Sequence, residues 1–329
     1  MATTSSGLSA AAVVLSVLVW AAIAYSAGPD LLPFIQSCPG GEGGPKNPMT
    51  GIALVDTFLC IIVPFFERLY GTSDSAMVAA NVFPTFSVFS FFLNAEAGRE
   101  GARGLITFPT LVIVLAQVLG FGVAAPLLLL LVLSPSPQRE SPRGISQAHA
   151  WLCLAITLPF VGVSSLLAAV GPNREISTWL MAVLQLVTVA PLLLMLARLP
   201  VIPASWRKPS PEGSRVAGLA FGILGGISFV AYWSSILLFL ERNYLIPMDP
   251  TSDGIEGILF SLLQLKVSLT PCAWALLADF AGVYLAVGLR ALSLDGLEGL
   301  SNFIVTSAVL SPGMACALQF SDLLAETDS

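Results

Sequence analysis

The stretch LITFPTLVIVLAQVLGFGVAAPLLLLLVL, residues 105–133, contains no charged side chain and a single amide, that of Gln117. A hydrocarbon layer of about 30 Å is crossed by a helix of about 20 apolar residues, so this stretch is long enough to span a membrane. Similar runs recur along the chain of 329 residues, of which only 10% are charged. Their length and number predict an all-α, polytopic integral membrane protein.

The distribution of apolar runs predicts about eight membrane-spanning helices, with about seven to nine as the range. The first run, residues 8–25, suits a span better than a cleaved signal peptide, because no basic residue precedes it. We expect the other spans at residues 51–66, 76–93, 105–133, 148–170, 178–199, 216–240, 258–289 and 297–320. Residues 28–50 between the first two spans should form an exposed connector, and the whole chain, residues 1–329, one helical membrane domain.

The run 258–289 is too long for one upright span, since a helix of this length would measure about 48 Å. Pro271 lacks a backbone donor and should break the helix near Thr270. Two interpretations stay open. Residues 258–270 form an interfacial or re-entrant segment before a span at 272–289, or the whole run is one tilted and kinked span.

Composition excludes some classes of function. The net charge is −6 and no basic cluster is present, so a nucleic-acid partner is not expected. The cysteine count is odd, with no Cys-x-x-Cys pair, which favours buried small residues over a disulfide or metal site. His149, the single histidine, is expected to be a solvated residue at the membrane interface. If the spans alternate, Lys and Arg slightly favour the side that holds the N-terminus and Arg68, which assigns that side to the cytosol.

Two carboxyl groups lie more than one turn inside predicted spans, those of Asp56 and Asp279. A charged carboxylate at such a depth costs at least about 2.5–3.5 kcal/mol, which protonation avoids. A neutral carboxylic acid in dry surroundings can protonate an olefin or an epoxide. The structural alternative is an interhelical hydrogen bond to Ser, Thr or backbone, and both interpretations stay open for each residue.

Glu96 and Arg99 lie three residues apart in a charged segment after the third predicted span. Alone, this pattern favours a solvated connector with a weak ion pair. The predicted topology, however, places Asp56, Glu96 and Asp279 in one half of the membrane, where they could line a shared cavity. Gln117 suits an interhelical hydrogen bond or a contact with a substrate oxygen. Phe86 follows Phe83 at helical spacing, either as ordinary packing or as an aromatic face that stabilises cations.

Several well-known catalytic motifs are absent from the sequence. There is no Asp-Asp-x-x-Asp cluster of the kind that holds Mg²⁺ against a diphosphate, no Asp-x-Asp-Asp acid motif, and no Gly-x-Ser-x-Gly elbow. Ionisation of a diphosphate is therefore not expected, and neither a metal site nor a cofactor is predicted.

Seven short segments stand out when they are read in order: LVD (54–56), PFF (64–66), EAGREG (96–101), FPT (108–110), QVLGFGVAAPL (117–127), LAD (277–279) and LSPGMA (310–315). In this order they resemble a family of fungal membrane-bound terpene cyclases, those of the ascochlorin and ascofuranone type. The resemblance covers residues 51–318, and residues 96–126 are its most specific part. The sequence departs from the family pattern at Ala102 and in the segment SPGM at residues 311–314, which can alter the substrate or product.

The resemblance implies cyclisation of a prenyl chain, usually farnesyl-derived, on an aromatic or polyketide head group. The reaction would start by protonation of a terminal epoxide or olefin, with Asp56 or Asp279 as the acid. Glu96, oriented by Arg99, would tune or reprotonate that acid, while Gln117 and Phe86 would contact substrate. We expect a multi-pass protein of the endoplasmic reticulum membrane that shares a pathway with a prenyltransferase and an epoxidase. The alternative is a polytopic carrier of a small lipophilic molecule.

Overall fold

The structure, a computed structural model, describes residues 2–38, 53–99, 107–132, 144–170, 201–241 and 269–325. The described part is almost entirely helical and contains no strand, only two isolated β-bridges. This confirms the predicted all-α class. The elements are α1 (Ala2–Ser37), α2 (Ala53–Leu69), α3 (Ser73–Ala97), α4 (Pro109–Leu119), α5 (Phe121–Pro126), the π-helix η2 (Leu127–Val132), α6 (Gln147–Val170), α8 (Ala204–Arg207), α9 (Pro211–Leu240), α11 (Pro271–Val309) and α12 (Pro312–Ala325).

Four of the described helices are long and apolar enough to cross a membrane: Gly7–Pro33, Ser73–Ala97, Pro211–Leu238 and Pro271–Val309. This architecture is compatible with a membrane protein, but it does not confirm a count of about eight spans. The expected span at 178–199 and the expected amphipathic segment up to residue 268 lie outside the described residues.

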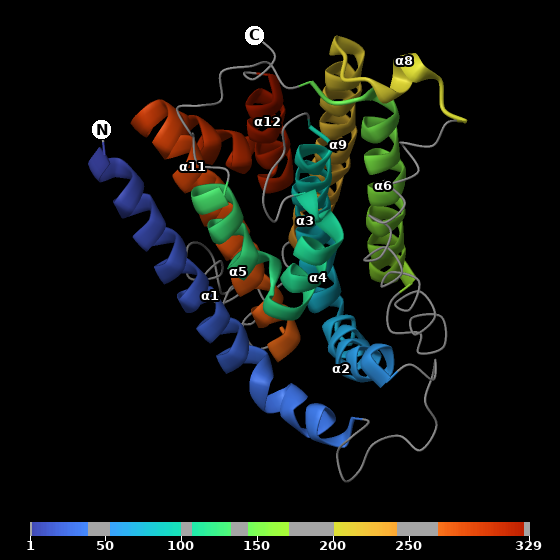
Figure 1. Cartoon of the computed structure of the whole chain (residues 1–329). Coiled ribbons are helices and arrows are strands. Elements are labelled where there is room, and N and C mark those ends of the chain that lie inside the picture. Colours follow the sequence, from blue (N-terminus) through green and yellow to red (C-terminus); the bar gives the residue numbers. More distant parts are fainter. Residues whose placement is uncertain are drawn as a thin grey trace.

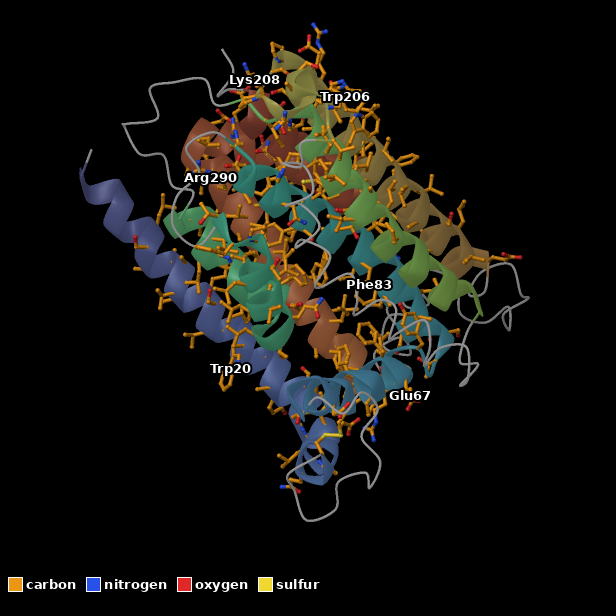
Figure 2. All side chains as sticks on the ribbon, turned by 45° about the vertical axis from the view of Figure 1, so that its right-hand side comes forward. Trp20, Glu67, Phe83, Trp206, Lys208 and Arg290 are labelled. Atoms are coloured by element: carbon orange, nitrogen blue, oxygen red, sulfur yellow. A yellow bond between two sulfur atoms is a disulfide. The ribbon has the colours of Figure 1, made fainter. Side chains whose placement is uncertain are left out.

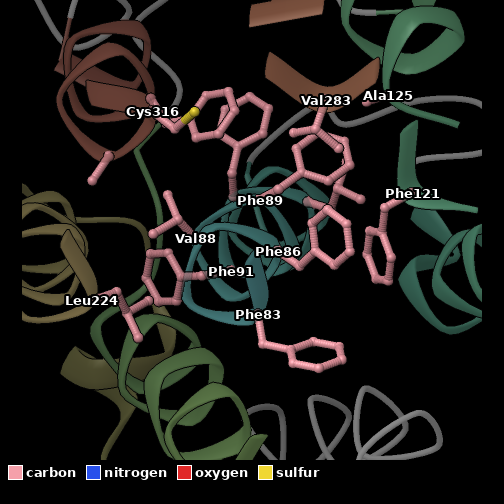
Figure 3. Packing of buried hydrophobic residues seen from close by; sticks show 14 of the residues in the cluster. Phe83, Phe86, Val88, Phe89, Phe91, Phe121, Ala125, Leu224, Val283 and Cys316 are labelled. Carbon is pink, nitrogen blue, oxygen red and sulfur yellow. The ribbon is translucent and has the colours of Figure 1, made fainter. Parts of the chain in front are cut away.

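Helix α3 occupies the centre of the bundle, between α6, α9, α11 and α12 (Figure 1). Nearly all its side chains from Val82 to Glu96 are buried. Buried phenylalanines of α3, among them Phe86, Phe89 and Phe91, pack against the neighbouring helices (Figure 3). The ring centroids of Phe91 and Phe221 are 4.8 Å apart, and those of Phe92 and Phe320 are 4.2 Å apart. Such close aromatic pairs add to the free energy of burial and fix the register of α3 against its neighbours.

Two runs that were predicted to be single helices are interrupted. The run 105–133 is split between α4 and α5 at Gly120, which has a φ of 104°. The expected span 297–320 breaks before Pro312. Two separate spans were expected on either side of residues 290–296, but α11 continues through these residues to Val309, with a bend at Gly296, whose φ is 67°. Only glycine adopts positive φ readily, so hydropathy alone did not reveal the break at Gly120. The predicted break near Thr270 is confirmed, because Thr270 caps α11 and Pro271 is its first residue.

The end of α1 corrects two expectations. Residues 28–37, expected in an exposed connector, continue the helix to Ser37, and Cys38 then forms a disulfide with Cys60 of α2. The interpretation of all five cysteines as unpaired was therefore wrong, because an odd count and the lack of a Cys-x-x-Cys pair do not exclude a disulfide between segments that the fold brings together. The three remaining cysteines, Cys153, Cys272 and Cys316, are free and buried.

A second contact holds α2 against the end of α1. Arg68 forms an ion pair with Asp30, with an Nη1–Oδ2 distance of 2.7 Å. Both contacts keep α2 at the C-terminal end of α1, the lower end of the bundle in Figure 1. The expected alternation of spans, which put Arg68 on the same side as the N-terminus, is therefore wrong.

Candidate functional site: an acid in an apolar cavity

A cavity of about 220 Å³ lies between α1, α2, α3, α4 and the start of α11. Among the described residues, its wall is apolar except for two side chains, Asp279 and Gln117. The other lining residues are Ile23, Ala27, Leu31, Ile62, Phe65, Phe66, Phe83, Phe86, Ala116, Leu119, Gly120, Phe121, Ala275 and Leu276. An apolar cavity with few convergent polar groups is the usual form of a small-molecule site.

Asp279 lies on the inner face of α11 and is 8% exposed. Its two carboxyl oxygens accept hydrogen bonds from the backbone of α5: the amide of Gly122 donates to Oδ1 at 2.6 Å, and that of Phe121 to Oδ2 at 3.1 Å. These amides belong to the first turn of α5, where N–H groups have no acceptor within the helix. The structural alternative considered for Asp279, a hydrogen bond to backbone, is thus present in the structure.

Glycines allow α5 and α11 to approach closely enough for these hydrogen bonds. The positive φ of Gly120 turns the chain so that the first amides of α5 face Asp279. A Cβ atom on Gly122 would overlap the backbone carbonyl of Asp279, and one on Gly282 would lie 2.5 Å from the carbonyl oxygen of Gly122. Small residues at helix contacts in membranes serve this purpose. The acid is therefore held by backbone atoms on a rigid contact.

Gln117 is the second polar group in the cavity wall. Its Oε1 atom is buried and has no hydrogen-bond donor among the described residues. A buried acceptor without a donor is unfavourable, by about 1–3 kcal/mol. The expected interhelical hydrogen bond is thus not seen for this oxygen, and a ligand hydroxyl in the cavity would satisfy it.

Aromatic rings form much of the remaining wall. Phe86 stacks on Phe121 with ring centroids 5.0 Å apart and 20° between the planes, and Phe66 stacks on Phe83 at 5.7 Å. Ring faces attract cations by about 0.5–2 kcal/mol each. The cavity thus combines an acid, a hydrogen-bonding amide and several ring faces.

Glu96 and Arg99 are buried, contrary to the expectation of a solvated connector. Their side chains are 8% and 6% exposed, and Arg99 donates from Nη1 to Glu96 Oε1 at 2.6 Å. The segment is buried because α3 continues to Ala97 and is then covered by α6. His149 of α6, expected to be solvated, lies with Nε2 2.8 Å from the carbonyl oxygen of Asn94.

The ion pair lies far from the cavity along the bundle axis. Ser75 of α3 is hydrogen-bonded to Thr270 before α11, which aligns the starts of the two helices. At 1.5 Å per residue, Asp279 and Phe86 lie about 14 and 17 Å beyond that contact, whereas Glu96 lies about 32 Å beyond it. The structure brings Asp279, Gln117 and Phe86 together and leaves Glu96 and Arg99 apart from them.

Asp56 lies neither in the cavity nor at the ion pair. It lies in the first turn of α2 and is 5% exposed, but it does not line the cavity. The shared cavity expected for Asp56, Glu96 and Asp279 is therefore not formed. That expectation required α2 to cross the membrane from the face at which α3 ends, whereas α2 stays at the end where α3 begins.

A second hollow, of about 440 Å³, lies between the end of α11 and α12. Its lining includes three carboxyl groups, and burial together with the charge of Asp295 raises the pKa of Asp322 above the ordinary value. Glu298 and Asp295 are exposed, so this hollow does not exclude water. Chemistry that requires a dry acid is better served by the cavity at Asp279.

Part of the chain is similar to a known family of cyclase-like proteins. Residues 14–177, just under half of the chain, match the family model of the CtvD domain, a terpene cyclase-like family of meroterpenoid biosynthesis. The match indicates a terpene cyclase-type role in meroterpenoid biosynthesis. It includes Gln117 and Phe86 but ends well before Asp279. Searches of curated proteins and of solved structures gave no match.

Sequence reasoning found the two polar groups of the cavity but missed the atoms that hold the acid. Gly120, Gly122 and Gly282 were not singled out, nor was Phe121. A usable signal exists in the spacing: glycines at 120 and 122, and another three residues after Asp279, lie within apolar runs. Glycines there indicate a close approach of two backbones.

Proposed function

We propose that this chain is a membrane-bound terpene cyclase that acts on the prenyl chain of a meroterpenoid intermediate. The supporting observation is the cavity itself, in which Asp279 and the Gln117 amide are the only polar side chains that the described residues contribute to an apolar, partly aromatic wall. An acid shielded from water can protonate a weak base such as an epoxide or an olefin, and the dry wall protects the resulting cation.

The proposed reaction starts with transfer of the Asp279 proton to the oxygen of a terminal epoxide. The C–O bond at the more substituted carbon breaks, and a neighbouring double bond supplies the electron pair for the new C–C bond. Loss of a proton from the last cation completes the reaction, so the product is an isomer of the substrate. With an olefin instead of an epoxide, the proton is added to a carbon atom of the double bond, and the formation of the C–C bond and the loss of a proton then follow as before.

The backbone amides of Phe121 and Gly122 support this role. Negative charge develops on the Asp279 carboxyl group as the proton leaves, and both amides already donate to its oxygens. Donors positioned where charge develops stabilise a transition state strongly. The faces of Phe86 and Phe121 stand beside the position of the cation, and the Gln117 amide would bind an oxygen function of the substrate.

The apolar cavity and the family match both support a prenylated substrate. A farnesyl-type chain with a terminal epoxide, on an aromatic or polyketide head group as in the ascochlorin and ascofuranone pathways, satisfies both. A prenyltransferase and an epoxidase must supply it, and we place all three enzymes in the endoplasmic reticulum membrane.

The test is expression in a fungal host that is fed farnesylated aromatic compounds and their terminal epoxides, with extracts analysed by mass spectrometry. A new compound of unchanged mass, absent from the host alone, is the expected result. Unchanged substrate in the presence of well-expressed membrane protein would contradict the cyclase and favour a carrier, which transport into vesicles would then measure.

A further inference from the structure

The two ends of the bundle differ in charge and in cysteine chemistry. Of the six described Lys and Arg residues, five lie toward the end that holds the N-termini of α6 and α9, and Figure 2 shows Arg290, Trp206 and Lys208 there and Glu67 at the opposite end. The sixth, Arg68, lies at the end of the bundle that holds the Cys38–Cys60 disulfide, where it pairs with Asp30. Positive residues favour the cytosolic side of a membrane, and disulfides form in oxidising compartments. Two independent features therefore assign the same orientation.

The cavity lies in the half of the bundle next to the disulfide. Its α11 residues, Ala275 to Asp279, come within nine residues of the start of that helix, and its α3 residues, Phe83 and Phe86, precede the middle or lie at it. Its α1 residues lie in the C-terminal half of α1, which ends at the disulfide. All these parts of the cavity wall lie toward the end of the bundle that holds the disulfide, and α2 lines the cavity at that end.

Among the described residues, a part of the cavity wall with few contacts lies between α1 and α4. Helix α1 packs against α11, α5, η2 and α2, yet it has hardly any contact with α4, although both helices line the cavity. Leu119 of α4 lines the cavity and is 40% exposed, and the outward side chains of α4 next to it are also apolar. At the depth of a hydrocarbon layer, such an opening faces lipid tails.

The volume is consistent with a chain that lies partly in this opening. A site that encloses a drug-sized ligand has about 300–1,000 Å³, which exceeds the cavity volume. A reactive chain end would fill the cavity of about 220 Å³, and the remainder would extend past Leu119.

We infer that the cavity admits its ligand sideways from the membrane, through the opening between α1 and α4, from the leaflet on the disulfide-bearing, non-cytosolic side. The occupant is a prenyl-type hydrocarbon chain, an identity that rests on the proposed function. The orientation and the opening rest on the structure alone, so they can fail or hold independently of cyclisation.

Orientation is tested in sealed microsomes with a membrane-impermeant maleimide, using two single-cysteine additions at exposed positions, Lys208→Cys and Ser73→Cys. We expect Lys208→Cys to react in sealed vesicles and Ser73→Cys only after detergent is added. The native free cysteines are buried and supply a low background. Reaction of Ser73→Cys in sealed vesicles would overturn the orientation.

The opening is tested in phosphatidylcholine proteoliposomes with a photoreactive farnesyl probe, whose covalent labelling needs no turnover. Leu119→Trp should reduce the labelling severalfold by narrowing the opening. The matched control is Leu115→Trp, one turn away on α4, equally exposed at 41% but outside the cavity lining, which should label like the wild type. Equal labelling of Leu119→Trp and wild type, or an equal loss in Leu115→Trp, would overturn the inference. Normal labelling without cyclisation would instead contradict the proposed function.

Discussion

At the scale of single residues, Asp279 has two roles that the same contacts serve. Its carboxyl group joins α11 to the first turn of α5, and each oxygen keeps a further lone pair beyond the one that the amide occupies. The carboxyl group can therefore hold the helices together and still present a proton to the cavity. Asp279 could be singled out from the sequence because a carboxyl group within an apolar span is energetically unfavourable, so its presence indicates a structural or functional role. Its partners were not, because they are backbone atoms 157 and 158 residues away.

Replacement of Gln117 distinguishes a role in ligand binding from a role in structural support. Replacement by Leu removes an amide whose oxygen has no protein donor, so thermal stability should be unchanged or slightly raised. The KM for an oxygenated substrate should rise by about two- to tenfold, the equivalent of one hydrogen bond, with a smaller effect on kcat. Thermal melts and steady-state kinetics measure both. A marked loss of stability with KM unchanged would show an interhelical role instead.

Glu96 should behave differently from Asp279, because it forms a buried ion pair away from the cavity. Glu96→Gln removes the negative charge beside the Arg99 guanidinium and should lower the free energy of unfolding by about 3–5 kcal/mol. The exposed control Glu298→Gln should stay within about 0.5 kcal/mol of wild type. Unfolding of the detergent-purified proteins measures the difference. If Glu96→Gln is fully stable but inactive, Glu96 takes part in catalysis.

At the scale of elements, the contact between α5 and α11 decides whether the cavity exists. Hydropathy predicted one helix over residues 105–133, and the apolar character of that run is correct. The break at Gly120 was invisible to it, because hydropathy measures transfer into lipid and carries no information on how closely two backbones approach. The same holds for α3, whose charged end is buried by tertiary packing that a local pattern does not show.

A glycine-to-alanine pair tests this contact. Gly282→Ala places a Cβ atom against the backbone of Gly122 and should destabilise the protein by about 1–3 kcal/mol, with loss of activity, because α5 is pushed away from Asp279. Gly222→Ala in α9 meets no atom within 4 Å and should be neutral or stabilise by up to about 1 kcal/mol. Melting temperatures of both variants are the readout, and equal effects would refute the close-contact account.

At the scale of the whole molecule, the sequence predicted the helical class and several helices that are long and apolar enough to cross a membrane, among them α3 and α9. It misplaced α2, because alternation was assumed for every apolar run. The disulfide and the Arg68–Asp30 pair hold α2 at one end of the bundle, and both are contacts between segments that only the fold brings together.

The disulfide should stabilise this end of the molecule. Reduction, or the double replacement Cys38→Ser with Cys60→Ser, should lower the free energy of unfolding by about 2–4 kcal/mol. A reductant should shift the melting temperature of the wild type and leave that of the double variant unchanged. No shift in the wild type would mean that the two thiols are not joined in the native protein.

The central claim, that Asp279 is the acid that starts cyclisation, is tested most directly by the turnover of a farnesyl-type epoxide in membranes containing Asp279→Asn, compared with wild type at equal protein level. Asparagine keeps the shape of the side chain and removes the transferable proton. We predict a loss of about 10²–10⁴-fold in turnover, the usual contribution of a general acid. Turnover equal to that of the wild type would contradict the assignment of Asp279 and of the cavity as the active site.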